Sequence, residues 1–407
     1  MAMIVSPLFS LYIHIPWCVK KCPYCDFNSH GRQGELPVRE YVAALLADLD
    51  GDLRDFGDAT ANREIISVFF GGGTPSLFAP EAIADILDGA TARLSFARHC
   101  EITLETNPGT VEHGRFDGYL AAGVSRLSFG VQSFDDDKLR RLGRIHSAAE
   151  AERAIKQAQD AGYDNINLDL MYALPRQTIE QSLADIERAI ALSPAHISHY
   201  QLTLEPNTAF AANPPPLPDD DAAWGMQTIC QTRLAQAGYA QYEVSAYARE
   251  GKRCTHNLNY WSFGDYLGIG AGAHGKITGG GKRETGGEAA SYWHLRRRWK
   301  VKHPRAYLEH AATAARIGDD AIVPRDELPF EYMLNALRLN DGVSVQDFAA
   351  RTDMPLSEIE APLREARVRG WLCDDADILR ATPHGQRFLN DVITLFLPPI
   401  PRQLRHA

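Results

Sequence analysis

Residues 11–30 read LYIHIPWCVKKCPYCDFNSH, and within them three cysteines follow the spacing C-x₃-C-x₂-C. Thiolates are the usual protein ligands of iron–sulfur clusters. Three thiolates on one loop, Cys18, Cys22 and Cys25, hold three corners of a cubane and leave the fourth iron open to a substrate or cofactor. A structural zinc site is the alternative, for which His14 or His30 would supply a fourth ligand. No second cysteine pair closes such a shell, because the other cysteines stand alone: Cys100, Cys230, Cys254 and Cys373.

Short β-rich runs alternate with helical patterns along the first half of the chain. Apolar residues recur at three- to four-residue spacing from Tyr41 to Phe56 and from Ile83 to Leu94, which predicts two helices. Capping boxes begin two more, at Ser147 with Glu150 and at Thr178 with Gln181. The strands predicted between them are Leu11–Ile15, Ile65–Phe70, Ile102–Glu105, Ser125–Phe129, Ile166–Leu170 and His196–Leu204.

Alternating strands and helices imply parallel strands joined by right-handed crossovers. Six such units predict an α/β fold of the partial (β/α)₆ barrel type, and a doubly wound open sheet remains the alternative. Phe70 to Pro75, FGGGTP, follows the second strand directly, as the cysteine motif follows the first. Both segments should therefore lie at the C-terminal mouth of the barrel, where active sites form in such folds. Glycines there let the backbone approach a ligand closely.

The second half of the chain divides by composition. NPPPLPDDD, residues 213–221, predicts a surface linker, and the glycine-rich stretch Thr278–Gly287 predicts a loop. From about Arg325 the pattern changes, and residues 370–396 indicate strand, turn, strand and helix, as in a winged-helix-like module. Acidic residues at its expected wing tip favour a packing unit over a DNA-binding one. We expect three parts: 1–215, the barrel core; 216–324, the barrel completion; and 325–407, the C-terminal winged-helix-like module.

Composition narrows the class of protein. The 407 residues are 45% hydrophobic and 23% charged, with a formal net charge of −10, which argues against nucleic acid as a partner. No uncharged apolar run is long enough to predict a membrane-spanning helix. The N-terminus lacks the basic start and cleavage site of a signal peptide, and seven cysteines are an odd number for a disulfide framework. We therefore expect a cytoplasmic protein whose clustered thiols bind metal.

The cysteine motif followed by GGGTP resembles the radical S-adenosylmethionine (SAM) superfamily. LYIHIPWCVKKCPYCDFNSH is similar to one branch, the oxygen-independent coproporphyrinogen III oxidases and their heme-chaperone relatives. The likeness continues through ETNPGT, RLSFGVQSF, LGRIH, INLDLMYALP and HNLNYW, over residues 11–261, and the C-terminal module also resembles theirs. This resemblance implies a [4Fe–4S] cluster and reductive cleavage of SAM to a 5′-deoxyadenosyl radical. Whether this chain performs radical chemistry on any substrate is left open.

The resemblance also implies roles for particular residues. Cys18, Cys22 and Cys25 would bind three irons, and the amine and carboxylate of SAM would chelate the fourth. A guanidinium suits a carboxylate, and carboxylates can accept hydrogen bonds from ribose hydroxyls. A purely structural role is the alternative, in which Glu105 and Asp169 are polar residues at strand ends and Arg144 forms an ion pair at a helix end. The residues implied to contact SAM are Tyr12, Tyr24, Gly72, Gly73, Thr74, Glu105, Gln132, Arg144 and Asp169.

Within this branch, three features favour the heme chaperones over the oxidases. Phe27 occupies the position of the fourth cysteine in the oxidase pattern C-x₃-C-x₂-C-x-C, and only 17 residues precede Cys18, whereas the oxidases carry a long N-terminal extension. Residues 256–261, HNLNYW, resemble the H-N-x-x-Y-W pattern of the chaperones. The resemblance implies a protein that binds heme and delivers it to heme proteins of the respiratory chain.

Two other functions stay open, SAM-dependent oxidative decarboxylation of coproporphyrinogen III and a binding module that keeps its cluster for structure. For heme, His256 is the candidate ligand, because histidine commonly binds heme iron. A hydrogen-bonded loop is the alternative explanation of His256, and surface histidines are other possible ligands: His294, His303 and His310. Respiratory acceptors would bring the protein to the inner membrane transiently, and a homodimer is left open.

Overall fold

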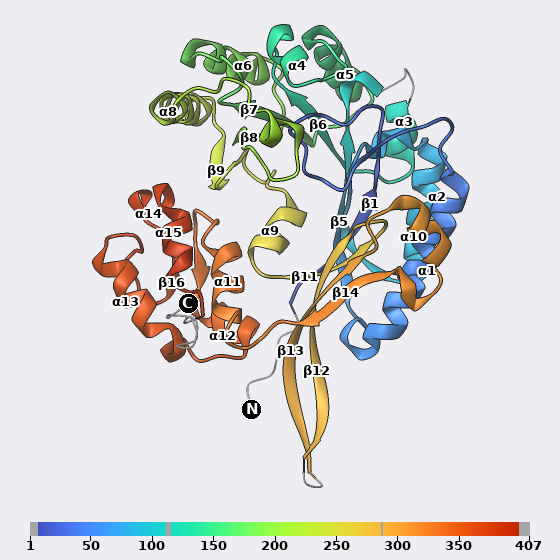
Figure 1. Cartoon of the computed structure of the whole chain (residues 1–407), viewed down its shortest axis with the longest axis vertical. Helices are drawn as coiled ribbons and strands as arrows, with labels where there is room; N and C mark the ends of the chain where they lie inside the picture. The colour runs from blue at the N-terminus through green and yellow to red at the C-terminus, as the bar shows by residue number, and fades with distance from the viewer. Residues whose placement is uncertain (1–6, 111–114, 286–287, 399–407) are drawn as a thin grey trace.

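The computed structural model describes residues 7–110, 115–285 and 288–398. One sheet of twelve strands forms its centre (Figure 1). Across the sheet the strands are β14 (Ile317–Ile322), β13 (Glu288–Lys300), β12 (His274–Thr285), β11 (Asp265–Ile269), β1 (Phe9–Ile15), β4 (Glu64–Gly72), β5 (Ser95–Thr106), β6 (Arg126–Gln132), β7 (Ile166–Tyr172), β8 (His196–Gln201), β10 (Ala246–Ala248) and β9 (Ala240–Glu243). All six predicted strands are present, although β8 ends three residues earlier than predicted.

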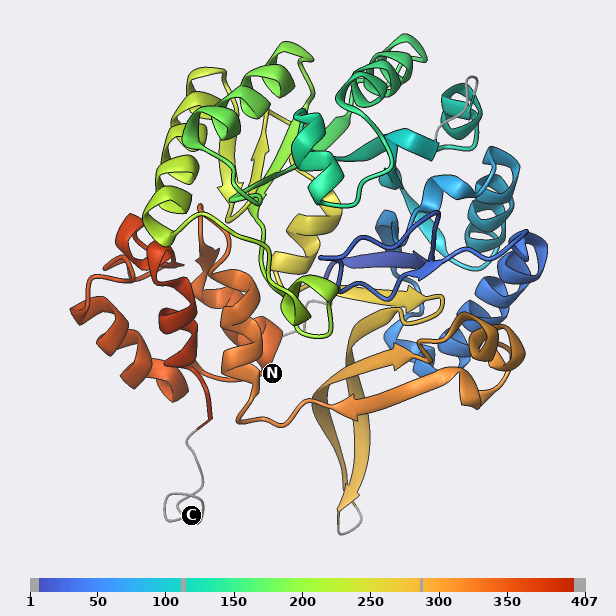
Figure 2. The same cartoon turned by 45° about the horizontal axis from the view of Figure 1, so that its top comes forward.

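The strands from β11 to β8 are parallel to their neighbours, and β1 to β8 lie in chain order without a reversal. A doubly wound sheet reverses its order at a switch point, so this order identifies the barrel type instead. Helices cover the outer face of the curved sheet (Figure 2). They are α1 (Val38–Phe56), α2 (Pro80–Thr91), α3 (Arg115–Ala121), α4 (Asp136–Arg141), α5 (Ala148–Asp160), α6 (Ile179–Ala191) and α8 (Asp220–Gln236).

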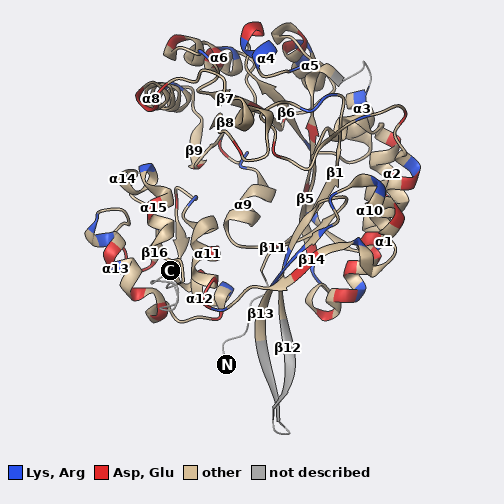
Figure 3. Ribbon diagram, viewed as in Figure 1, with Lys and Arg blue, Asp and Glu red and all other residues tan. Residues whose placement is uncertain are grey.

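The local signals read from the sequence explain these helices. Tyr41, Leu45 and Leu49 are fully buried on the inner face of α1, as the 3.6-residue period requires. Both predicted capping boxes are formed, at the N-termini of α5 and α6. Figure 3 shows acidic and basic residues interspersed along these helices. The N-terminal lead-in, residues 1–6, lies outside the described residues.

The loop predicted for Thr278–Gly287 is wrong over its described part. Thr278–Thr285 belongs to β12, which pairs with β13 in a long antiparallel hairpin. Glycine is depleted in strands because it has no side chain to pack, but it is used where a neighbour approaches closely. A Cβ on Gly279 would lie 2.8 Å from the imidazole of His294 on the opposite strand. Pairing with β13 therefore determines the extended conformation of this segment, and the local sequence around the glycines does not reveal it.

The C-terminal module packs around its own apolar cluster, which includes Tyr332, Met333, Phe348 and Val392. Its helices and strands are α11 (Leu328–Ala336), β15 (Val343–Ser344), α12 (Val345–Thr352), α13 (Glu360–Val368), β16 (Ile378–Leu379), α14 (Pro383–Arg387) and α15 (Leu389–Thr394). An antiparallel bridge between Leu372 and Ala381 closes the predicted wing. The predicted fold class, a partial (β/α)₆ barrel with a winged-helix-like module, is confirmed.

The remaining short elements lie near the mouth of the barrel or at its side. They are β2 (Trp17–Cys18), β3 (His30–Gly31), α7 (Ala209–Ala212), α9 (Thr255–Trp261) and α10 (Pro304–His310). Figures 1 and 2 place α9 inside the curve of the sheet, where Asn259 donates to Ser10 Oγ of β1 at 2.9 Å. Within the described ranges, the structure contains no helix suited in length and hydropathy to crossing a membrane.

Candidate radical SAM site

A cavity of about 790 Å³ opens at the C-terminal ends of the parallel strands. Segments that follow different strands contribute to its wall, so residues far apart in the sequence meet here. All three motif cysteines line it, together with the glycine segment after β4 and polar side chains from β5, β6 and β7. The sequence-predicted residues in this wall are Cys18, Cys22, Tyr24, Cys25, Gly72, Gly73, Thr74, Glu105, Gln132, Arg144 and Asp169.

The cysteine loop, residues 17–31, is fixed at both ends. Its ends pair as the short parallel strands β2 and β3, and Cys25 N–H donates to Cys22 O at 3.2 Å in between. All three cysteines are free and half-buried. Cys22 Sγ lies 3.7 Å from Arg144 Nη1, and Cys25 Sγ lies 3.6 Å from Ser29 Oγ. Burial raises the pKa of the Cys18 and Cys25 thiols.

The glycine segment after β4 crosses close against this loop. Gly73 and Thr74 donate their backbone N–H groups to Ile15 O and Trp17 O, each at 2.8 Å. Gly72 has a φ of 110°, and a Cβ there would lie 2.5 Å from the imidazole of His14. Only glycine suits this position, because both the backbone conformation and the space exclude a side chain.

Charged and polar groups line the rest of this cavity. Arg144 donates to Gly130 O at 2.6 Å, and its buried Nε has no hydrogen-bond partner among the described residues. Asp169 accepts from Ser128 Oγ at 3.0 Å. Burial, and secondly the charge of Asp169, raise the pKa of Glu105 to about 8. A cation with an unused, buried donor and two carboxylates in the lining of one cavity suit a zwitterionic ligand that carries hydroxyl groups.

Tyr200 and Arg338 are among the cavity residues that the sequence did not indicate. Tyr200 donates to Gln132 Oε1 at 2.8 Å and so orients that amide. Arg338 reaches the same cavity from the C-terminal module, and its guanidinium lies 4.2 Å from the ring centre of Trp261. No motif marks either residue, because tertiary packing alone brings them to the cavity.

A second cavity, of about 760 Å³, adjoins the first. Tyr12 lies in its wall and not in that of the first cavity, with its hydroxyl 3.0 Å from His14 Nδ1. Six aromatic side chains belong to the lining: Tyr12, Phe27, Phe69, Tyr260, Trp261 and Tyr266. The two cavities share wall residues, namely Cys25, Asp26, Phe27, Gly72, Glu105 and Trp261.

His256 lies in the wall of this second cavity, on α9. The alternative prediction placed His256 in a hydrogen-bonded loop, and this is wrong because the residue lies in a helix. Glu101 caps that helix by accepting the N–H groups of Thr255 and His256 at 2.8 and 3.3 Å. The His256 ring is 7% exposed, bonds Ser67 Oγ through Nδ1 at 3.2 Å and stacks on Phe69 at 4.9 Å. Burial lowers the pKa of His256 to about 3.

The residues of the first cavity fit the cofactors of a radical SAM protein. Its lining brings together three free thiols, two carboxylates and Arg144, whose buried Nε has no partner among the described residues. A family model of the radical SAM superfamily matches residues 12–189, and a model of the HemN C-terminal domain matches residues 323–388. The fold, the cavity and this match together define a radical SAM protein, a class that uses a [4Fe–4S] cluster and SAM.

Comparison with known proteins narrows this class further. Heme chaperone HemW of Haemophilus influenzae is 49% identical over 391 residues, which cover 96% of this chain and 98% of that protein. Heme chaperone HemW of Escherichia coli is 48% identical, covering 97% and 100%. The chain belongs to the HemW family. The solved structure of coproporphyrinogen III oxidase (HemN) from Escherichia coli shares the fold, with a TM-score of 0.79 at 22% identity over 96% of this chain and 90% of that one.

Proposed function

We propose that this protein is a heme chaperone, which binds heme and delivers it to heme proteins of the respiratory chain. Near-full-length identity of 48–49% with proteins named heme chaperone HemW carries the proposal. The proposal includes transient association with the inner membrane at the acceptor, and a homodimer is compatible with it. Phe27, at the position of the oxidases' fourth cysteine, supports a chaperone over a coproporphyrinogen III oxidase.

In this proposal Cys18, Cys22 and Cys25 hold the cluster. A [4Fe–4S] cluster bound by three thiolates supplies an open iron that SAM chelates and an electron for its reductive cleavage. The chain's own residues bind and orient SAM and exclude water from the cavity. Backbone groups of Gly72, Gly73 and Thr74 face the methionyl amine, while Tyr24 contacts SAM from the cysteine loop. Tyr12, which lines the neighbouring cavity, contacts SAM from that side.

The polar wall holds the rest of SAM. Arg144 pairs with the carboxylate, for which its buried, unpartnered Nε supplies a donor. Glu105 and Asp169 accept from the ribose hydroxyls. Gln132 completes this set, and its amide is oriented by the hydrogen bond from Tyr200.

Replacing Arg144 with alanine is expected to weaken SAM binding by ~2–4 kcal/mol, because the buried carboxylate loses its cationic partner. Equilibrium binding to the anaerobically reconstituted protein measures this loss. Arg140→Ala is the matched control, since the Arg140 side chain is 71% exposed and pairs only at the surface. Wild-type affinity in Arg144→Ala, with the cluster intact, would remove Arg144 from the SAM site.

The function itself is tested by anaerobic titration of the reconstituted protein with hemin. A shifted Soret band saturating at about one heme per chain, followed by transfer to an apo-cytochrome of a respiratory complex, is the expected result. In a parallel assay with reductant and SAM, we expect no conversion of coproporphyrinogen III to protoporphyrinogen IX. Many turnovers there, with a Soret band that stays at the position of free heme, would replace the chaperone by the oxidase.

A further inference from the structure

The second cavity has the chemistry of a porphyrin site. Its walls carry several aromatic side chains, and its volume of about 760 Å³ lies in the range of cofactor pockets. A flat apolar macrocycle gains most from such walls, since aromatic rings stack on its face. Two lysines, Lys21 and Lys302, belong to the lining and are exposed, so they stand at its rim. Ammonium groups at the rim suit the two propionates of heme.

Three histidines line this cavity, and two of them already have partners. Both ring nitrogens of His14 are engaged, Nδ1 with Tyr12 Oη at 3.0 Å and Nε2 with Asn28 O at 2.9 Å. His256 is held by Ser67 and stacked on Phe69. Using His14 as an iron ligand would break one of these hydrogen bonds. His256 has a partner at Nδ1 alone among the described residues, but its ring is buried against Phe69, so an iron bound there would lie deep in the barrel interior.

His274 differs from both. It begins β12, its residue is exposed, and its ring stacks on Trp299 at 5.6 Å with an interplanar angle of 21°. No hydrogen bond engages its ring nitrogens within the described part of the chain. Although the residue is exposed, partial desolvation of its ring, followed by the positive charges of Lys302 and Arg297, lowers the pKa of His274. Its imidazole is therefore neutral near pH 7, which is the form that binds a metal.

We infer that heme occupies the second cavity with His274 as its axial ligand and with Lys21 and Lys302 at its propionates. This inference rests on the proposed heme-chaperone function and assigns its binding site. A single ligand at the exposed start of β12 suits a carrier, because the iron can leave without opening the barrel interior. The adjoining first cavity stays free for SAM.

Hemin titration of full-length reconstituted variants tests this site. His274→Ala is expected to shift the Soret band away from its wild-type position and to weaken binding by at least about tenfold. Added imidazole should restore the band by replacing the lost ligand. His384→Ala is the matched control, because His384 is exposed and lines neither cavity, and it should keep the wild-type band position. His256→Ala tests the competing ligand, and melting curves of all variants check that they fold. The double variant Lys21→Gln, Lys302→Gln should bind more weakly without a change in band position.

A wild-type Soret band and affinity in His274→Ala would overturn the inference. A loss of the band in His256→Ala alone, with the protein folded, would also overturn it and assign the iron to α9. These outcomes leave the chaperone function intact. If wild-type protein gives no shifted Soret band at any hemin concentration, the proposed function fails before the site is in question.

Discussion

Replacing Cys18, Cys22 and Cys25 together with alanine is expected to abolish the iron–sulfur cluster. Reconstituted wild-type protein should hold about four irons per chain, and the triple variant less than about one. No neighbouring side chain can replace three thiolates as iron ligands. The other four cysteines are far from this loop along the chain. Iron and sulfide analysis, with the absorbance of the reconstituted protein, measures the loss.

Cys373→Ala is the matched control, because Cys373 is a free, half-buried cysteine in the C-terminal module. It should keep the full iron content. The cysteine loop retains its backbone pairing between β2 and β3 in the triple variant, so circular dichroism should be unchanged. A full cluster in the triple variant would mean that other residues ligate it, and the proposed site would be lost.

Much of the barrel could be predicted because its signals are local. Capping boxes at Ser147 and Thr178 mark helix starts without reference to the rest of the fold. The apolar stripe of α1 faces inward with the expected residues, among them Tyr41 and Leu45. Strand–helix alternation then leaves few arrangements, and the chain order of β1 to β8 is the simplest of them.

The hairpin of β12 and β13 could not be predicted, because its reason is not local. Glycines near Gly279 indicate a loop when read alone, and only the facing His294 explains why a residue without Cβ is needed in a strand. The residues of the two cavities likewise divide into those that a sequence motif indicates and those that only the folded structure reveals. Motif resemblance pointed to Cys18 and Arg144, whereas Arg338 and His274 carry no motif and reach the cavities through tertiary packing.

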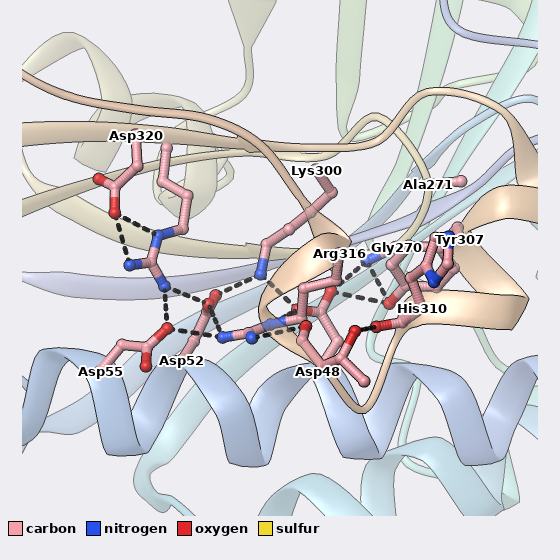
Figure 4. A network of polar contacts seen from close by, with 12 residues as sticks. Asp48, Asp52, Asp55, Gly270, Ala271, Lys300, Tyr307, His310, Arg316 and Asp320 are labelled. Carbon is pink, nitrogen blue, oxygen red and sulfur yellow. Dashed lines mark hydrogen bonds and ion pairs between the residues drawn. The ribbon is translucent and has the colours of Figure 1, made fainter.

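A buried ion network beneath the mouth of the barrel ties α1 to β13 and to the turn after β11 (Figure 4). The carboxylate of Asp48 bonds Lys300, accepts from Arg316 Nε at 3.0 Å and accepts from Tyr307 Oη at 2.7 Å. Its side chain and that of Lys300 are almost fully buried, at 0% and 1% exposed. Asp52 bonds both cations as well, so each charge is compensated within the network.

This network also supports the cysteine loop. Gly270 N–H lies 3.2 Å from Asp48 Oδ2 and 3.0 Å from Tyr307 Oη, which anchors the turn between β11 and β12. The next residue, Ala271, accepts from Asn28 Nδ2 at 2.9 Å, and Asn28 belongs to the cysteine loop. The same turn leads directly into His274. Charges on the outer side of the sheet therefore position residues of both cavities.

Asp48→Asn is expected to lower the free energy of unfolding by ~3–5 kcal/mol, because it leaves buried cations short of one compensating charge. Asp50→Asn is the matched control on the same helix. Asp50 is 41% exposed and pairs with Arg93 at the surface, where an ion pair contributes less than about 1 kcal/mol. Urea unfolding of the cluster-free proteins compares the two variants, and iron content after reconstitution reports on the cysteine loop. Equal stability losses in the two variants would show that the buried network does not hold the turn and the loop together.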